Sequence, residues 1–374
     1  MMSASGSRNG AGPTSLRPRP FLRDGTIIPL GAFDLLHPIG RGGMAEVWRG
    51  VHRQSGVPVA VKILSGEQYR DPFLLECFRT EARAVAQLHH SSIILLYDYG
   101  EVPFETSQAS GGTIKAGHPY LVMELATGGT LAHQPPRSWP ELMTILSRLL
   151  DALAHAHARG VIHRDIKPSN VLVSAPGDVR PGLKLTDFGS ATAGRPELAS
   201  RDEESLVGTA SYMPPEQIRG KIRDSGPWTD LYSIGVLGWV LASGHPPFRH
   251  DDLHELFRMH LRADLPDLLP RFPVPDGFEG WLQAMLAKDI GGRYRRAADA
   301  AWALEQVAAA EDIFVSPRDS AQSLPTRTLP SDAFQTLTIN DDGSIAGFAG
   351  VNRVSGRVDA KKLAQGVWEA TTIV

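Results

Sequence analysis

The residues of this sequence that could do chemistry gather first in VIHRDIKPSNVLV, residues 161–173, where a charged loop separates two apolar runs. Asp165 can accept the proton of an incoming hydroxyl group, and Lys167 can neutralise a phosphoryl group during its transfer. Asn170 offers an amide oxygen to a metal ion. A base, a cation and a metal ligand in one short loop indicate phosphoryl transfer.

A second carboxylate, Asp187, follows the hydrophobic run of LKLTDFGSA, residues 183–191. Mg²⁺ prefers oxygen ligands and substrate phosphates, so a carboxylate at this place suits a metal site. A plain Asp-Phe-Gly turn is the alternative for this segment taken alone.

Lys62 lies inside the apolar strand-like run VAVKIL, where a lysine is costly unless its charge is used. Phosphate oxygens could use that charge, and Glu81 in the following helical segment could orient the lysine through an ion pair. The structural alternatives are an outward-facing lysine on an alternating strand and a solvated surface glutamate.

The segment IGRGGMAEVW sets Gly40 and Gly42 between two strand-like runs, ahead of Val47. Glycine allows backbone N–H groups to approach phosphates closely. A glycine-rich hairpin turn would have the same sequence, so this segment alone is weak evidence. It is not a Walker A loop, because no Gly-Lys-Ser/Thr sequence ends it.

The elements that must position these residues fall into two classes along the chain. Short apolar stretches alternate with turn residues from Phe33 to about Leu64, and a helix is predicted from Pro72 to Leu88. Two more strand-like runs, IILLYDYG and PYLVMEL, follow the helix. Between them, the segment from Phe104 to Gly117 predicts a polar loop with little potential to join a core.

After His133 the pattern changes to helices. Apolar residues recur at i, i+3 and i+4 spacing between Leu142 and Leu153, and Gly160 is placed as a C-cap. The other predicted helices cover about 228–243, 251–263, 278–288 and 297–311. The expected fold class is therefore α+β, with a small β-rich lobe before a larger helical lobe.

Composition excludes several other classes of protein. The chain has 374 residues, 42% hydrophobic and 21% charged, and its net charge of -3 gives no argument for a nucleic-acid or anionic-membrane partner. The single cysteine, Cys77, excludes an intramolecular disulfide and a cysteine-rich metal site. The start lacks the apolar core of a signal peptide, and the apolar run Leu231–Gly244 is well short of the ~20 residues that span a bilayer. We therefore expect a cytoplasmic protein without a transmembrane span.

Together the motifs resemble those of the eukaryotic-type protein kinase family, and GRGGMAEVW and HRDIKPSN resemble its bacterial serine/threonine branch. The resemblance implies a bilobal protein kinase fold, with an N-lobe over residues 31–126 and a C-lobe over 127–312. Residues 1–30 are expected to be a disordered extension, and 313–374 a low-complexity tail with a regulatory role. The implied activity is transfer of the γ-phosphoryl group of ATP to Ser/Thr hydroxyls of protein substrates, with autophosphorylation and with Mg²⁺, or Mn²⁺ in its place, as the metal.

The resemblance also implies a role for each matching residue. Asp165 would be the catalytic base, assisted by Lys167, Lys62 and Glu81, and the metal would be bound by Asn170 and Asp187. Met123 resembles the gatekeeper, and backbone groups of Glu124 and Ala126 would bond adenine. The full set of implied nucleotide contacts is Ile39, Gly40, Gly42, Val47, Ala60, Lys62, Met123, Glu124, Ala126 and Leu172.

The segment GTASYMPPE, residues 208–216, resembles the end of an activation segment. The resemblance implies that Thr209 hydrogen-bonds Asp165 and Lys167. Glu216 would form a structural ion pair with Arg293. The aspartate of WTDLYSIG, Asp230, resembles the residue that caps the catalytic loop.

Regulation is implied by Arg164, which directly precedes the proposed base. In the family this arginine receives a phosphate carried by the activation loop, through a charge-assisted contact. Ser200 and Ser205 are the predicted phosphorylation sites by position, whereas Thr209 is expected to be structural.

Several positions depart from the family pattern. Ala45, which is also small, replaces the third loop glycine. Pro214 replaces the alanine of the usual Ala-Pro-Glu, and Ile290 replaces the proline of the usual Asp-Pro before the late arginine, and neither of these two changes removes a chemical group.

Two competing functions remain. A nonenzymatic scaffold is disfavoured by the intact Lys62, Asp165 and Asp187, and a small-molecule phosphotransferase by GTASYMPPE, which resembles a platform for peptide substrates.

The tail leaves several interpretations open. It could be a disordered linker, or a docking segment for phosphothreonine-binding forkhead-associated domains, which favour an aliphatic residue three positions after the phosphothreonine. Thr336 with Ile339 and Thr371 with Val374 fit that spacing. The segment GSIAGFAGVNRVSGR could also form a strand pair. Resemblance to bacterial kinases further allows a homodimer through the small lobe.

Overall fold

The computed structural model describes residues 27–41, 45–64, 72–188 and 208–312, together with the C-terminal stretches 336–339, 344–349, 352–357 and 372–373. The chain divides into two compact units, Met1–Phe314 and Val315–Val374, and each is considered by itself.

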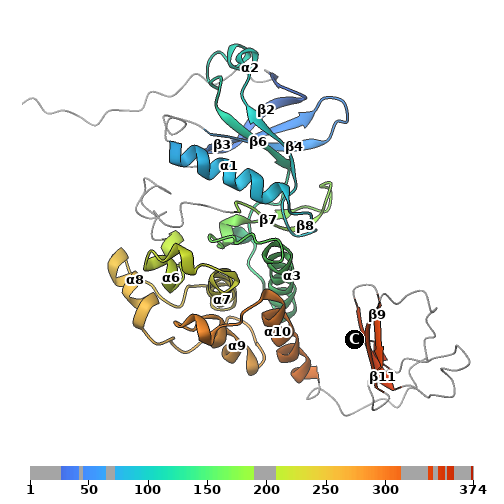
Figure 1. The fold of residues 1–374 in the computed structure, drawn as a ribbon, viewed down its shortest axis with the longest axis vertical. Coiled ribbons are helices and arrows are strands. Elements are labelled where there is room, and N and C mark those ends of the chain that lie inside the picture. Colours follow the sequence, from blue (N-terminus) through green and yellow to red (C-terminus); the bar gives the residue numbers. More distant parts are fainter. Residues whose placement is uncertain are drawn as a thin grey trace, which may run out of the picture. The chain divides into compact units, whose positions relative to one another are not determined.

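The first unit opens with a six-stranded sheet in the order β1-β2-β3-β4-β6-β5, in which every pair of neighbours is antiparallel. Figure 1 shows its strands β2, β3, β4 and β6 together with α1. Helix α1 (Pro72–Ala86) packs against β5 and β6. The strands are β1 (Ile28–Leu30), β2 (Phe33–Arg41), β3 (Ala45–His52), β4 (Pro58–Leu64), β5 (Leu96–Glu101) and β6 (Pro119–Glu124).

The sheet begins earlier than the sequence analysis predicted, because β1 lies within the extension 1–30 that was expected to be disordered. Ile28 and Leu30 are fully buried and pair with Leu35 and Phe33 of β2. The alternating apolar side chains of Ile-Pro-Leu reach the core of the sheet, so the interpretation as disordered is wrong for these residues. Residues 1–26 lie outside the described ranges.

The segment between β5 and β6 also differs from its prediction as a loop with little core potential. It contains a short helix, α2 (Phe104–Ala109), and it buries Thr106 and Ile114 in the core of the sheet. The hydroxyl of Thr106 donates a hydrogen bond of 2.6 Å to the carbonyl of Pro29 on β1. A few buried contacts among many polar residues are enough to anchor the segment, and composition averages conceal them.

The larger lobe is helical, as predicted (Figure 1). The central helix α7 is buried along nearly its whole length, and a Cβ added at Gly235 would meet the Cβ of Met285 on α9 at 2.7 Å, so glycine permits this close helix packing. The helices are α3 (Trp139–His157), α6 (Pro215–Ile218), α7 (Pro227–Ser243), α8 (Leu253–Arg262), α9 (Gly277–Met285) and α10 (Ala297–Asp312), with 3₁₀ turns η2 (Leu131–His133), η3 (Pro168–Asn170), η5 (Ile222–Asp224) and η6 (Ile290–Gly292).

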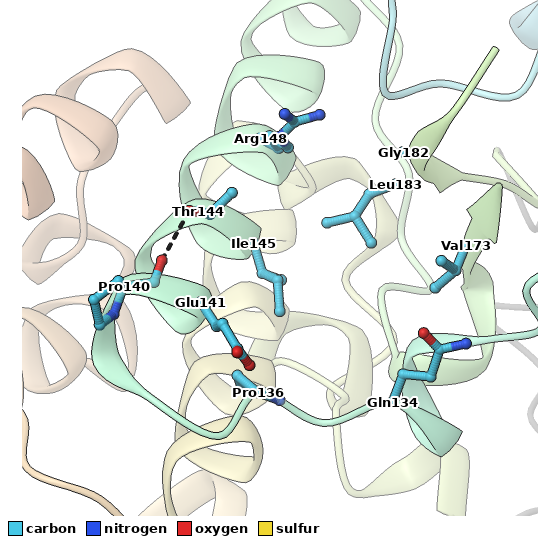
Figure 2. A pocket seen from close by; sticks show the side chains of 10 residues that line it. All are labelled: Gln134, Pro136, Pro140, Glu141, Thr144, Ile145, Arg148, Val173, Gly182 and Leu183. Carbon is cyan, nitrogen blue, oxygen red and sulfur yellow. Dashed lines mark hydrogen bonds between the residues drawn. The ribbon is translucent and has the colours of Figure 1, made fainter. Parts of the chain in front are cut away.

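A two-stranded antiparallel ribbon lies at the boundary of the two lobes. It consists of β7 (Val171–Ser174) and β8 (Gly182–Leu185), and it follows the charged loop singled out in the sequence. Leu185 also forms an isolated bridge with Ile93, which precedes β5. A hollow of about 490 Å³ lies beside this ribbon. Its lining residues include Val173 and Leu183 of the ribbon and Ile145 and Arg148 of α3, all labelled in Figure 2.

The largest hydrophobic cluster joins the two lobes. It combines Phe78, Ala82 and Val85 of α1 with the buried faces of α3 and α7. A separate cluster fills the other side of the sheet around Trp48 and Val61. Helix α1 is therefore packed into the same core as the helical lobe.

The second unit contains a four-stranded antiparallel sheet in the order β12-β11-β10-β9. Its strands are β9 (Thr336–Ile339), β10 (Ser344–Ala349), β11 (Asn352–Arg357) and β12 (Thr372–Ile373). The pairing of β10 with β11 is the strand pair that the sequence left open for GSIAGFAGVNRVSGR. Within the described parts of both units, we find no helix with the length and apolar character needed to cross a bilayer.

Candidate active site

Lys62 on β4 joins side chains that are far apart in the sequence. Its Nζ lies 2.9 Å and 3.1 Å from the two carboxylate oxygens of Glu81 on α1, and 2.7 Å from Oδ1 of Asp187 after β8. The predicted ion pair of Lys62 with Glu81 is therefore present. Asp187 extends it into a three-membered cluster that links the sheet, the helix and the lobe boundary.

The charges of this cluster support one another. Burial alone would lower the pKa of Lys62, but the carboxylates of Asp187 and Glu81 outweigh this effect and raise it above its usual range. Burial alone would raise the pKa of Asp187, yet Lys62 lowers it below the usual value. Burial raises the pKa of Glu81, and Lys62 offsets only part of that effect. At neutral pH the site therefore keeps a charged ammonium group and an ionised Asp187.

The loop before β7 places the three residues first identified in the sequence side by side. Lys167 Nζ lies 2.9 Å from the carboxylate of Asp165, and the amide nitrogen of Asn170 donates to the same carboxylate at 3.0 Å. The same nitrogen also donates to the backbone carbonyl of Asp165 at 2.7 Å. Because the Asn170 nitrogen is used in this way, its amide oxygen remains as an acceptor.

Asp230 of α7 anchors this loop, as predicted. Its carboxylate is fully buried and accepts hydrogen bonds from the backbone N–H groups of His163 and Arg164, both at 2.8 Å. It also lies 2.7 Å from Nε2 of His157. Burial alone would raise the pKa of Asp230, but the contact with His157 and the backbone donors lower it, so it holds the loop as a carboxylate.

Two non-glycine residues at the site have left-handed backbone conformations, Arg164 with a φ of 69° and Asp187 with a φ of 62°. Such conformations are uncommon for residues with a Cβ and gather at functional sites. The hydrogen bonds to Asp230 and Lys62 hold them in place. His163 connects the two segments, since its Nε2 lies 2.9 Å from the carbonyl of Thr186.

Thr209 approaches the loop through Lys167. The Nζ of Lys167 donates to the Thr209 hydroxyl at 3.0 Å and also contacts the carboxylate of Asp165. The sequence predicted that Thr209 bonds both residues. In the structure the contact with Lys167 is direct, and Lys167 links Thr209 to Asp165.

Several of the predicted nucleotide contacts lie on neighbouring strands of the sheet. Gly40 pairs with Val47, and Val47 pairs with Lys62 in the next ladder. Ala60 pairs with Met123, and both are buried. Glu124 ends β6 and Ala126 follows it, Ile39 is about half exposed on β2, and Leu172 lies on β7. Gly42, Ser200 and Ser205 lie outside the described residues.

Glu216 and Arg293 form the predicted structural ion pair. Two parallel contacts of 2.9 Å and 3.0 Å join the guanidinium to the carboxylate, and both side chains are buried. Thr229 of α7 donates a third hydrogen bond of 2.9 Å to Glu216. This pair ties the segment after Gly208 to the helical lobe.

Sequence reasoning missed the residues that surround Glu124. Arg180 and Lys184 both reach its buried side chain, and Asp178 binds Thr127 nearby. A lysine flanked by leucines in LKL was a signal, because a buried lysine requires a partner. The partner itself lies far away in the sequence and follows from no local pattern.

Comparison with known proteins identifies the class of fold and site. Residues 33–295 match the family model described as the protein kinase domain, so the chain belongs to this family. Over 330 residues it is 36% identical to the serine/threonine-protein kinase PknA of Mycobacterium tuberculosis strain H37Rv, covering 87% of this chain and 72% of that protein. It is 36% identical over 299 residues to PknL of the same strain (76% of this chain, 68% of PknL). It is 34% identical over 294 residues to Pkn1 of Myxococcus xanthus (78% of this chain, 40% of Pkn1).

The protein is thus an ATP-dependent serine/threonine protein kinase of the bacterial Hanks type, with proteins as substrates and a divalent metal as cofactor. The predicted family, fold class and activity are confirmed.

Proposed function

We propose that this chain transfers the γ-phosphoryl group of ATP with Asp165 as the base for the acceptor hydroxyl and Lys167 as the cation beside the transferring group. The observation that carries the proposal is the contact of Lys62 with both Glu81 and Asp187, at 2.9 Å and 2.7 Å. This contact joins the phosphate-binding strand to the lobe boundary, which is the arrangement that phosphoryl transfer requires.

Lys62 is proposed to bind the α- and β-phosphates. Its raised pKa keeps it positively charged throughout the physiological range, and Glu81 fixes its direction. Asp165 orients the acceptor hydroxyl and takes its proton, while Lys167 stays close enough to both Asp165 and Thr209 to hold the acceptor side of the site in register.

Asn170 and Asp187 fit a divalent metal, and we propose Mg²⁺. The amide oxygen of Asn170 and the ionised carboxylate of Asp187 are the hard oxygen donors that Mg²⁺ takes from proteins, with substrate phosphates completing its shell. The backbone N–H of Thr186 donates to the backbone carbonyl of Asn170 at 3.0 Å, so the two proposed ligands come from segments that are hydrogen-bonded to each other. When bound, the metal neutralises phosphate charge.

The adenine end of ATP is proposed to lie against the segment after β6. Backbone groups of Glu124 and Ala126 would bond adenine, with Met123 as gatekeeper. Gly40 and Gly42 would cover the phosphates. Support comes from the ladder that aligns Ala60 with Met123 and Val47 with Lys62. The apolar side chains proposed to enclose the ring are Ile39, Val47, Ala60 and Leu172.

Autophosphorylation is proposed at Ser200 and Ser205, with Arg164 as the receiver of the phosphate. The buried Nε of Arg164 has no hydrogen-bond partner within the described part of the chain. A guanidinium whose Nε–H has no acceptor suits a phosphate, which accepts charge-assisted hydrogen bonds. Activity that stays unchanged after both serines are replaced by alanine would refute this regulatory role.

Partners beyond the substrates are proposed for the tail and the small lobe. Phosphorylated Thr336 or Thr371 would bind a forkhead-associated domain, and the small lobe would form a homodimer. Thr336 is the first residue of β9, and Thr371 lies outside the described residues. A pull-down with the phosphorylated tail tests the first partner, and sedimentation at several concentrations tests the second.

The test of the function is transfer of label from radioactive ATP by the wild type and by Asp165→Asn, with Mg²⁺ and with Mn²⁺. We expect label on serine and threonine in the wild type and a loss of more than about 100-fold in the variant, because general-base catalysis contributes 10²–10⁴-fold. Equal labelling by both proteins would reject Asp165 as the base. Mass spectrometry of the labelled chain locates the acceptor residues.

A further inference from the structure

The hinge between the lobes, residues 124–129, is held from outside by the loop that joins β7 to β8, residues 175–181. None of the residues proposed above for catalysis or metal binding lies in this loop. It makes side-chain contacts with the hinge on both sides of Leu125 and Ala126.

Before Leu125 in the sequence, two cations contact the buried carboxylate of Glu124. Arg180 Nη1 lies 2.5 Å from Oε2, and Lys184 Nζ lies 3.5 Å from Oε1. The side chain of Glu124 is 3% exposed and that of Lys184 is 1% exposed. In such a place each charge requires its partners, so the side chains of Glu124 and Lys184 have little freedom to move.

After Ala126 in the sequence, Asp178 binds Thr127. Its carboxylate accepts hydrogen bonds from the backbone N–H and the hydroxyl of Thr127, both at 2.8 Å. It also accepts from the N–H of Ala175, at 2.7 Å, which fixes Asp178 within its own loop. Burial alone would raise the pKa of Asp178, but these hydrogen bonds lower it, so it is a carboxylate at neutral pH.

The same cations also hold the segment after α1. Arg180 Nη2 donates to the carbonyl of His90, and Lys184 Nζ donates to the carbonyl of Ser91, each at 2.5 Å. Arg180 therefore divides its guanidinium between two segments of the small lobe.

The hinge needs such support because of its sequence. Gly128 and Gly129 follow Thr127, and glycines leave the backbone free to adopt many conformations. Gly128 is fixed by its N–H, which donates to Val173 of β7 at 2.8 Å. Backbone groups recognise a ligand well only when their positions are set before binding.

We propose that Asp178, Arg180 and Lys184 are positioning residues for adenine recognition: they hold Glu124 and Thr127 so that the backbone groups between them meet the base. The inference rests on the proposed function, which places adenine at Glu124 and Ala126. It deepens that function by assigning base recognition to the helical lobe as well as to the sheet.

The experiment compares two ligands that share adenine but differ in phosphate. Adenosine and ATP are titrated calorimetrically into the full chain and into Arg180→Met, Asp178→Ala and Lys62→Met. We expect the two loop variants to weaken adenosine and ATP by the same factor, about fivefold, which corresponds to roughly one lost hydrogen bond. Lys62→Met should weaken ATP and leave adenosine unchanged.

Matched controls separate positioning from loss of stability. Arg258→Met removes an arginine from an exposed ion pair with Glu255 at 2.7 Å, and it should leave both affinities unchanged. Arg180→Lys keeps the positive charge but cannot bond Glu124 and the His90 carbonyl through two separate nitrogens. It should therefore recover only part of the adenosine affinity that Arg180→Met loses. In steady-state assays the loop variants should raise KM for ATP while kcat and KM for the peptide stay within about twofold.

The outcomes distinguish the inference from the function on which it rests. Wild-type adenosine affinity in Arg180→Met and Asp178→Ala, with a selective loss of ATP affinity in Lys62→Met, would overturn the positioning role and leave the proposed function intact. Unchanged ATP affinity in Lys62→Met would instead contradict the proposed phosphate contact. Loop variants that melt earlier but bind adenosine normally would show a structural role alone and would also overturn the inference.

Discussion

At the scale of single residues, the surroundings of two carboxylates of the site keep them in the charged form. Asp187 and Asp230 are both held below the usual pKa of a carboxyl group, one by Lys62 and the other by His157 and backbone donors, against the opposing effect of burial. Asp187, the proposed metal ligand, and Asp230, the anchor of the loop before β7, are therefore both charged at neutral pH. Their partners, rather than their own chemistry, make this arrangement stable.

Glu216→Gln should destabilise the fold because it leaves the Arg293 guanidinium buried without a counter-charge. The side chains of the pair are 2% and 0% exposed, and breaking such a pair typically costs about 3–5 kcal/mol. Urea denaturation measures the change in the free energy of unfolding. The matched control is Glu255→Gln in the exposed pair with Arg258, which should cost less than about 1 kcal/mol. Equal effects in both variants would contradict the argument.

His260 predicts a dependence of stability on pH. Burial and the neighbouring Lys288 lower its pKa to about 3 in the folded protein, whereas an unfolded histidine takes up a proton near pH 6.5. The unfolded state therefore binds more protons between these values, and the free energy of unfolding falls as the pH is lowered, by up to about 1.4 kcal/mol per pH unit. Above about pH 7 this contribution is complete.

The measurement is urea denaturation of the wild type and His260→Gln between pH 5 and 7.5, chosen at roughly the window that this histidine controls. The variant should show a slope smaller by about one proton. His254→Gln changes an exposed histidine of the same helix and is the control for replacing a histidine as such. A slope unaffected by His260→Gln would show that other groups cause the pH dependence.

At the scale of elements, small buried contacts decide whether a polar segment joins the core. Two variants within the segment from Phe104 to Gly117 test this. Ile114→Ala should lower the free energy of unfolding by about 2–5 kcal/mol, because this side chain is 4% exposed in the core of the sheet. Phe104→Ala should change stability by less than about 0.5 kcal/mol, since Phe104 is 68% exposed. Denaturant unfolding of both variants measures this contrast, and a larger loss at Phe104 would contradict it.

The sequence predicted well what depends on local pattern. The periodicity from Leu142 to Leu153 corresponds to the buried face of α3, and the contiguous HRDIKPSN motif placed Asp165, Lys167 and Asn170 in one loop. Asp187 lies 125 positions after Lys62; the family resemblance assigned both to one site but predicted no contact between their side chains.

The remaining features depend on contacts that have no local signature. Arg180 reaches Glu124 from 56 positions away, and the alternation in β1 is too short to separate it from a disordered extension. Thr106 and Ile114 are buried within a stretch whose average composition is polar. In each case tertiary partners override what the segment alone suggests.

At the scale of the whole molecule, the shared core makes the two lobes one folding unit. Phe78 and Val85 of α1 belong to the same hydrophobic cluster as the helices of the large lobe, so the position of Glu81 depends on packing that both lobes contribute. The Lys62–Glu81 contact is therefore set by the lobe boundary as well as by the sheet. Every described residue to which we assign a catalytic or metal-binding role lies within the first compact unit.

A chain that ends after Phe314 should consequently retain kinase activity, with kcat and KM for ATP within about twofold of the full-length values, because compact domains with their own core fold independently. The match to the protein kinase family ends at residue 295, before this truncation point. Steady-state transfer to a peptide substrate measures both constants, and Asp165→Asn in the shortened chain sets the background. A large fall in kcat at unchanged melting temperature would show that residues 315–374 act on the site. Loss of autophosphorylation label without loss of peptide phosphorylation would instead locate acceptor residues in the tail.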